Sequence, residues 1–297
     1  MRITQSMINE NFTRNLMQNL KRLGDINDMI SSRKKIRRPS DDPVGAAMAL
    51  KLRRQLAAIE QYNNNAQDAL TWMKDTETAL ANTGDILQRL NELTIQAANG
   101  PLTDDDRQKI LYEVKELKDQ IFQEANSTSI NRYMFGGYTT DKPPFIKDED
   151  TGKIEANTAE TVDGVIEYNL GHSERIPINL IGSEVFEDIF VSVEKLEEAL
   201  ETNDSAVISS QVLEDIKNSM STVLKYRAQI GARSNRLEAT VLRLDANEVD
   251  YLELLSNTED IDLARMITEL KMEESVYRAS LSVGARIIQP SLVDFLR

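Results

Sequence analysis

Cysteine is absent from the 297-residue sequence, and histidine occurs once. The lack of cysteine excludes disulfides, thiol catalysis and zinc–thiolate sites. A zinc motif with two histidines is also impossible, and a serine–histidine–acid site would have to use His172. This histidine lies in the segment LGHSE between two predicted strands. We therefore expect it to be a surface loop residue rather than a catalytic one.

Long apolar runs are missing as well. No stretch of about 18 apolar residues occurs, so no membrane-spanning helix is predicted. The first residues, MRITQSMINENFTRNL, are too polar for the apolar core of a secretory signal peptide. We expect a soluble protein which, if it leaves the cell, does so without a cleaved signal peptide.

Glycine, proline and aromatic residues are few: 12 Gly, 7 Pro, 7 Phe, 8 Tyr and one Trp. With so few turn formers and rings, the composition is typical of long helices that pack through aliphatic side chains. The net charge of −14 argues against a protein that binds duplex nucleic acid. The first 54 residues nevertheless carry 12 Lys or Arg against 5 Asp or Glu. This basic segment is either a solvated helical face or a contact for an anionic partner.

Apolar residues recur at steps of three and four over most of the chain, which predicts amphipathic helices. The first helix is predicted over about 5–32, with the stripe Ile8, Phe12, Leu16, Leu20, Leu23, Ile26 and Ile30. Further helices are predicted over about 44–98, 104–125, 187–200 and 204–256. An isolated amphipathic helix has nothing against which to bury its stripe, so the first helix needs a partner.

The stretch RRPSDDPVGAAMA at 37–49 raises three interpretations: a phosphate loop, a metal site or a helix start. A phosphate loop is excluded, because only one glycine is present and carboxylates repel phosphate. A metal site lacks further ligands nearby in the sequence. Asp41 or Asp42 is a suitable N-cap, and Pro43 a suitable first helical residue. The stretch is therefore interpreted as the start of the second helix.

The region from 139 to 182 differs from the rest. Pro143-Pro144, the turn Asp150-Thr151-Gly152 and two alternating segments predict short strands and hairpins. DEDTG at 148–152 resembles a calcium loop, but its glycine comes one residue early and the closing acid is missing. No catalytic, metal or cofactor site is predicted anywhere, so packing is the expected basis of function.

The last helical segment has the most regular pattern. Its stripe steps by four and three residues, a repeat of 3.5 that is typical of a coiled-coil seam. The members are Leu263, Ile267, Leu270, Glu274, Tyr277, Leu281, Gly284 and Ile288. Both ends of the chain are therefore predicted to be amphipathic helices without an obvious partner in its middle.

Four separated segments together resemble the bacterial flagellin superfamily: RRPSDDPVGAAMALKLR, LQRLNELTIQAANG, INRYMFGGYTTDKPPF and IGARSNRLEA. They occur in the same order as in that family and cover both terminal thirds of the chain. Arg-Pro-Ser-Asp-Asp-Pro and the final SLVDFLR are most similar to the members that join the flagellar hook to the filament. Filament flagellins more usually have a serine- and alanine-rich run before the paired aspartates.

The resemblance implies a mainly α fold: a long antiparallel helical rod or coiled coil built from both terminal regions, with a small β-rich central insertion. On this basis 1–42 and 258–297 form an axial layer, 43–138 and 183–257 form the rod, and 139–182 points outward. The implied partners are further copies, neighbouring axial proteins, the adjacent hook-associated protein and flagellin, and an export chaperone, with no nucleic acid and no membrane insertion. The implied location is the extracellular flagellum, reached through type III export.

The assembly interface expected from these patterns consists of one stripe from each terminal helix. Its residues are Ile8, Phe12, Leu16, Leu20, Leu23, Ile30, Leu263, Ile267, Leu270, Tyr277, Leu281 and Ile288. Contacts between the axial layer and the rod are expected from Arg38, Pro39, Asp41, Asp42, Pro43, Gly231, Arg233, Asn235 and Arg236.

A specific hypothesis concerns IGARSNRLEA. Small Gly231 would let a facing helix approach, and Arg233 or Arg236 would pair with Asp41 or Asp42. The alternative is an ordinary exposed basic turn of helix. At the level of function, three alternatives to a hook–filament junction protein stay open: a filament flagellin, a cytoplasmic helical scaffold and, least favoured, an enzyme.

Overall fold

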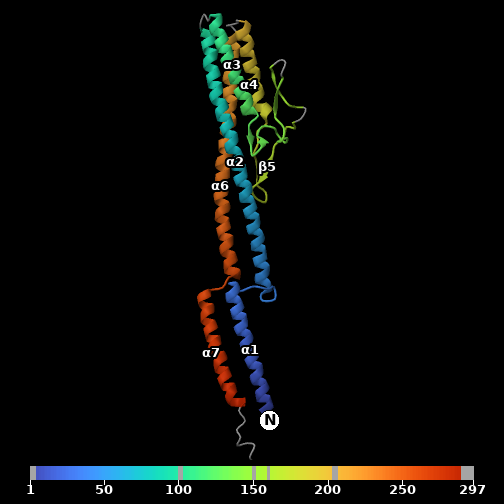
Figure 1. The fold of residues 1–297 in the computed structure, drawn as a ribbon, viewed down its shortest axis with the longest axis vertical. Helices are drawn as coiled ribbons and strands as arrows, with labels where there is room; N and C mark the ends of the chain where they lie inside the picture. Colours follow the sequence, from blue (N-terminus) through green and yellow to red (C-terminus); the bar gives the residue numbers. More distant parts are fainter. Residues whose placement is uncertain (1–4, 100–102, 149–151, 159–160, 203–206, 289–297) are drawn as a thin grey trace, which may run out of the picture. The chain divides into compact units, whose positions relative to one another are not determined.

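The computed structural model describes residues 5–99, 103–148, 152–158, 161–202 and 207–288. Long helices dominate these ranges, which confirms the prediction of a mainly α fold with a small β-rich insertion (Figure 1). Within them, no helix is both long enough and apolar enough to cross a membrane. The helices are α1 (Gln5–Ser32), α2 (Pro43–Asn99), α3 (Asp104–Ala125), α4 (Gly182–Thr202), α6 (Leu213–Glu259) and α7 (Leu263–Ile288), with a π-helical turn η1 (Ile208–Val212) before α6.

The chain divides into two compact units. Unit 1 comprises Met1–Ala58 and Glu248–Arg297, and unit 2 comprises Ile59–Asn247. The first therefore contains both terminal helices, and the second contains all the strands. The helices α2 and α6 contribute residues to both units.

In unit 2, α2 and α6 lie side by side and run antiparallel. Asn63 Nδ2 donates to Asp245 Oδ1 at 2.8 Å, and Arg227 donates to Glu77 at 2.8 Å. As the residue number rises in α2, that of its partner in α6 falls. Thr83 and other small or aliphatic residues of α2 are buried along this helix.

The helices α3 and α4 complete an up-and-down bundle with α2 and α6 (Figure 1). Arg89 of α2 donates to Glu113 of α3 at 2.7 Å, and Lys195 of α4 donates to Asp215 of α6 at 2.7 Å. The bundle core is aliphatic, and burial of each such side chain contributes about 1.5–3 kcal/mol. Fully or almost fully buried core residues include Leu80, Leu87, Leu90, Ile121, Val193, Leu196, Ile216 and Val223.

Each described strand belongs to a two-stranded antiparallel hairpin. Two of the hairpins lie inside the segment 139–182 that the sequence marks as β-rich, and the first lies before it. The pairs are β1 (Thr128–Ser129) with β2 (Arg132–Tyr133), β3 (Phe145–Lys147) with β4 (Ile154–Ala156), and β5 (Glu167–Asn169) with β6 (Arg175–Pro177). The single histidine, His172, is exposed in the β5–β6 turn as expected.

A cluster of phenylalanine rings joins the hairpin region to α4. The ring of Phe186 lies 4.9 Å from that of Phe135 and 5.9 Å from that of Phe145, both edge-to-face. Phe145 also contacts Phe190 at 5.2 Å. Such edge-to-face pairs add to the burial of the rings. The hairpin region is therefore packed onto the bundle through aromatic contacts rather than merely tethered to it.

Candidate assembly surface

In unit 1, α1 and α7 pack along each other as an antiparallel pair (Figure 1). Asn19 Nδ2 donates to Ser280 Oγ at 3.1 Å, and Arg22 Nε lies 3.3 Å from Glu273 Oε1. The residues of α7 that α1 partly or fully covers form one row with a repeat of three and four. They are Met266, Leu270, Glu273, Tyr277, Ser280 and Gly284, and Glu274 of the predicted stripe, beside this row, is half-buried as well.

This row differs from the stripe predicted for α7. Leu270, Tyr277 and Gly284 belong to both; the first two are half-buried and Gly284 is buried. In contrast, Leu263, Ile267 and Leu281 remain 40%, 49% and 44% exposed. The stripe predicted from the coiled-coil repeat thus contains residues of two different rows. One row faces α1, and the other is an apolar flank that α1 leaves uncovered.

The predicted stripe of α1 divides in the same way. Phe12, Leu16, Leu23 and Ile30 are half-buried, whereas Ile8 and Leu20 are exposed. Ile288 ends α7, but its side chain lies outside the described residues.

A second exposed flank of α7 was missed by sequence reasoning. Met272, Val276 and Val283 are 63%, 40% and 51% exposed. At 3.6 residues per turn they lie on the side of the α1-facing row opposite to Leu263, Ile267 and Leu281. Only a count of every apolar position, rather than the best-fitting repeat, would have found them. We call the two sets together the α7 flanks.

Glu259, at the end of α6, is the centre of an ionic cluster in unit 1. Its side chain is only 6% exposed and accepts hydrogen bonds from Lys34 Nζ at 2.6 Å and from Arg53. A buried carboxylate is costly without such partners. Here the two cations come from the α1–α2 connection and from α2, so the carboxylate joins three segments. Nothing in the sequence singled out this glutamate.

Backbone hydrogen bonds reinforce this cluster. Lys35 N donates to Glu259 O at 2.6 Å, and Ile261 N donates to Arg33 O at 3.3 Å. The α1–α2 and α6–α7 connections thus pair as a short antiparallel bridge, centred on Lys34 and Asp260. Arg33 has a left-handed backbone with φ of +55°, which few residues with a side chain adopt. The cluster and this bridge together are called the clasp below.

The aspartates of RRPSDDPVG act locally. Asp42 Oδ1 accepts from Val44 N at 3.1 Å and from Gly45 N at 3.0 Å, which confirms the predicted N-cap of α2. Asp41 accepts from Arg38 N at 2.9 Å, and this backbone bond lowers the pKa of its carboxyl group. The side chains of Arg38, Pro39 and Pro43 are exposed.

The arginines of IGARSNRLEA have other partners than those proposed from the sequence. Arg236 donates to Glu174 Oε1 at 3.1 Å, and Arg233 Nη1 donates to Pro177 O at 3.5 Å. Burial lowers the pKa of Arg233. The proposed pairing of these arginines with Asp41 or Asp42 is therefore wrong for this chain: they hold the β5–β6 hairpin on α6.

Gly231 and Asn235, the other two residues of this motif that were expected to make contacts, do not support a close approach of helices. No heavy atom of the described chain lies within 4 Å of where a Cβ of Gly231 would be. Asn235 is exposed. The structure thus gives a role to the long side chains of the motif and none, within this chain, to its glycine.

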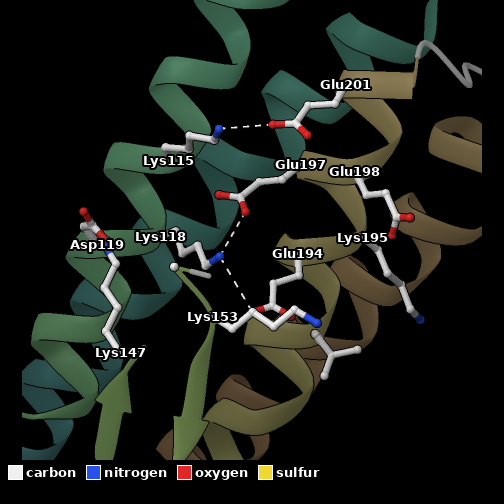
Figure 2. Close-up of a pocket in the computed structure, with 12 residues that line it drawn as sticks. Lys115, Lys118, Asp119, Lys147, Lys153, Glu194, Lys195, Glu197, Glu198 and Glu201 are labelled. Carbon is white, nitrogen blue, oxygen red and sulfur yellow. Dashed lines mark hydrogen bonds and ion pairs between the residues drawn. The ribbon is translucent and has the colours of Figure 1, made fainter. Parts of the chain in front are cut away.

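A cavity of about 720 Å³ lies between α3, α4 and the β3–β4 hairpin (Figure 2). Lysine and acidic side chains line most of it, and several of them form ion pairs with one another. The buried Lys118 donates to Glu197 at 2.9 Å and lies 3.7 Å from Glu194, while Lys147 donates to Asp119 at 2.5 Å. These pairs fasten α4 and the hairpin to α3, so the polar groups serve packing.

Nowhere in the described ranges do three or more His, Cys, Asp or Glu side chains come together in a way that could hold a metal ion.

Comparison with known proteins agrees with the architecture. Residues 3–140 match the model of the bacterial flagellin N-terminal helical region, and residues 213–296 match that of the C-terminal helical region. Flagellar hook-associated protein 3 of Salmonella typhimurium is 28% identical, over 94% of this chain and 95% of the relative. The flagellar filament 30.7 kDa core protein of Treponema maltophilum is also 28% identical, over 87% and 86% of the two chains.

A solved structure shares the fold. The hook-associated protein of Vibrio parahaemolyticus superposes with a TM-score of 0.67 at 24% identity, over 74% of this chain and all of that one. The two family models together span most of the sequence and contain both terminal helices and the bundle helices α2, α3 and α6. The chain belongs to the bacterial flagellin family.

Proposed function

We propose that this protein is a structural component of the bacterial flagellum that joins the hook to the filament. Its near full-length similarity to a relative named flagellar hook-associated protein 3 supports the junction role. The observation that carries an assembly role is the pair of apolar α7 flanks. A helix that exposes valine, leucine, isoleucine and methionine on both sides of its contact with α1 has more apolar surface than α1 can cover.

Packing between subunits would cover these flanks. In a tube of axial proteins, each α1–α7 pair would have neighbours on more than one side. Burial of an apolar side chain contributes about 1.5–3 kcal/mol, and the contribution repeats in every subunit. The proposed neighbours are further copies, the adjacent hook-associated protein and flagellin. No chemistry at a catalytic centre is required for this role.

The proposed location is the outside of the cell, at the hook–filament junction. Export would pass through the flagellar type III channel, with a cytoplasmic chaperone that covers the terminal helices beforehand. Exposed apolar side chains of α1 such as Met17 are a suitable target for such a chaperone. Deletion of residues 2–30 should retain the protein in the cytoplasm. Normal amounts in the medium would contradict this route.

Immunogold labelling of intact flagella tests the junction role. A label confined to a narrow band at the distal end of the hook is the expected result. Label along the whole filament would identify a filament subunit instead, which the similarity to filament core proteins keeps as the second candidate. Label inside the cell only would contradict both and favour a cytoplasmic scaffold.

A further inference from the structure

Unit 1 is built from two segments of opposite charge. Residues 1–58 carry 12 Lys or Arg against 5 Asp or Glu, whereas residues 248–297 carry 5 against 10. Some of these charges are neutralised inside the chain: in the clasp, Lys34 and Arg53 bind the buried carboxylate of Glu259. Others have no such partner, and these indicate what the basic segment can contact outside the chain.

The start of α2 exposes two cations that the fold does not use. Ala49 and Leu52, which are 5% and 3% exposed, mark the packed face of the helix. At about 3.6 residues per turn, Leu50, Lys51 and Arg54 lie together on the opposite side, and all three are exposed. Within the described ranges, no hydrogen bond or ion pair joins the charged group of Lys51 or Arg54 to another residue.

The end of α6 repeats this pattern with the opposite charge. Leu255 and Glu259, half-buried and buried, mark its packed face. The exposed Val249, Asp250 and Glu253 lie on the opposite side. Neither carboxylate has a hydrogen bond or ion pair in the part of the chain that the structure describes. In each helix, therefore, an exposed aliphatic residue at position i is followed by like charges at i+1 and i+4.

These two surfaces face away from each other. At this level of unit 1, α2 and α6 lie side by side, because Arg53 of α2 binds Glu259 of α6. Each charged surface is on the side of its helix that is not packed. The basic edge of unit 1 is defined as Leu50, Lys51 and Arg54. The acidic edge is defined as Val249, Asp250 and Glu253.

The charges of the two edges select one kind of contact between identical copies. A two-fold contact at either edge would place like charges against one another, whereas contact of a basic edge with an acidic edge matches them. Copies with a net charge of −14 repel one another, but physiological salt screens this repulsion beyond about 8 Å. The charges that meet directly therefore decide, and the aliphatic residue of each edge adds apolar surface to the contact.

We propose that the basic edge of one copy docks against the acidic edge of its neighbour in the assembled flagellum. Lys51 and Arg54 then pair with Asp250 and Glu253 of the adjacent copy. The inference rests on the proposed function, which places identical subunits side by side. Exposed ion pairs add little affinity, so the apolar α7 flanks hold the copies together and the edges fix their direction. Repeated by a rotation, such a heterologous contact closes a ring.

Charge reversal in two different chains tests the contact. Cells that lack their own copy of the gene produce either Lys51→Glu/Arg54→Glu, with two acidic edges, or Asp250→Lys/Glu253→Lys, with two basic edges. Each variant alone should lower the number of filaments per cell at least about tenfold, because like charges meet at every contact. Production of both variants in one cell should restore filaments, because each acidic edge then meets a basic edge of the other variant.

The control for this experiment is Lys74→Glu/Lys217→Glu, which reverses two exposed charges of α2 and α6 in unit 2. It should change the number of filaments less than about twofold. All of these variants should unfold at the wild-type temperature, because the replaced side chains are exposed. If joint production does not restore filaments, the charges pair inside one chain or with a different protein, and the proposal is wrong. Normal filament numbers in each reversal variant alone would also overturn it.

Crosslinking measures the contact directly. Because the chain has no cysteine, Arg54→Cys and Glu253→Cys each introduce its only thiol. Intact flagella that contain both chains, with a different tag on each, should give a mixed dimer with a short bismaleimide. Flagella that contain only the Arg54→Cys chain should give no dimer. A dimer in these flagella would show that like edges meet, and absence of the mixed dimer would show that unlike edges do not; either result contradicts the inference.

These outcomes separate the inference from the proposed function. If the wild-type gene restores filaments to the deletion cells and the reversal variants do so equally well, only the contact between edges is wrong. If the wild-type gene itself restores none, the junction role fails, and with it the inference that rests on it.

Discussion

The ring of Phe12 in α1 occupies the space that a side chain at Gly284 of α7 would fill. A Cβ built on Gly284 would overlap three atoms of this ring, and Gly284 is buried under it. The absence of a side chain at one position of α7 therefore lets an aromatic residue of α1 pack directly on the helix backbone.

Gly284→Ala should consequently weaken the α1–α7 pair. We expect a loss of about 1–2 kcal/mol, because the added methyl group forces the ring out of its position. Hydrogen exchange of the amides of α1 and α7 should increase, with unit 2 unaffected. Gly24→Ala in α1 is the control: nothing lies within 4 Å of its Cβ position, so it should stabilise α1 through helix propensity. Phe12→Leu added to Gly284→Ala should recover part of the loss.

Leu281→Asp should abolish assembly and spare the monomer. Leu281 is 44% exposed on an α7 flank, so in the isolated chain the carboxylate remains hydrated. Between subunits the same group would be desolvated at a cost of several kcal/mol. We expect an unchanged melting curve by circular dichroism, together with bare hooks and flagellin shed into the medium.

Two variants of the same helix control for this result. Ser282→Asp adds the same charge at the next, polar position and should permit assembly. Leu270→Asp adds it to the row that faces α1 and should destabilise the monomer. If Leu281→Asp also unfolds the monomer, Leu281 belongs to an intrachain core and the assembly role of this flank is wrong.

Glu259→Gln should loosen the clasp. The substitution removes the charge that neutralises Lys34 and Arg53, while the amide retains nearly the same shape. Because these two cations are 39% and 49% exposed, we expect a loss of about 1–2 kcal/mol, less than the 3–5 kcal/mol of a fully buried pair. Amides at the start of α7 should exchange faster. Unchanged exchange there would show that the backbone bridge suffices without the carboxylate.

The contact between the β5–β6 hairpin and α6 should weaken in acid. Arg243, which donates to Glu174 at 2.5 Å, and Arg236 lower the pKa of the Glu174 carboxyl, against the opposing effect of its partial burial. Because the pKa of Glu174 is lower in the folded chain, this pairing stabilises the fold fully at a pH above 4.5, the pKa of the group in the unfolded chain. The contribution is lost as the pH falls through the pKa of the folded chain.

NMR of the hairpin amides measures this transition. Glu174→Gln should produce the weakened contact at neutral pH and remove the acid transition. Glu167→Gln is the control, because Glu167 pairs with Arg175 inside the hairpin and does not contact α6 through that pair. An acid transition that persists in Glu174→Gln would assign it to another carboxyl group.

Local signals in the sequence determined the helices and their ends. Periodic apolar positions place α1, α2, α3 and α7 within a few residues of their observed bounds, because a helix that buries one face must repeat at 3.6 residues. The end of α6 is placed equally well, but its predicted start near 204 precedes Leu213, because the π-helical turn η1 lies between them. Asp42 was one of two candidate N-caps of α2, since a cap bonds to an amide two or three residues along the chain. The family resemblance likewise depends on short segments whose order is visible without any structure.

Tertiary structure alone decided which face of each terminal helix meets its partner. The apolar stripe of α7 is broader than the surface that one partner helix can cover, and the sequence does not show which part of it is covered. Leu263, Ile267 and Leu281 therefore seemed equivalent to Leu270 and Tyr277. The partners of long charged side chains were equally hidden. Arg236 pairs with Glu174, 62 residues away, and Lys34 with Glu259, 225 residues away, because the fold brings them together. Spacing along the chain predicts contacts within one helix, and only packing determines those between distant segments.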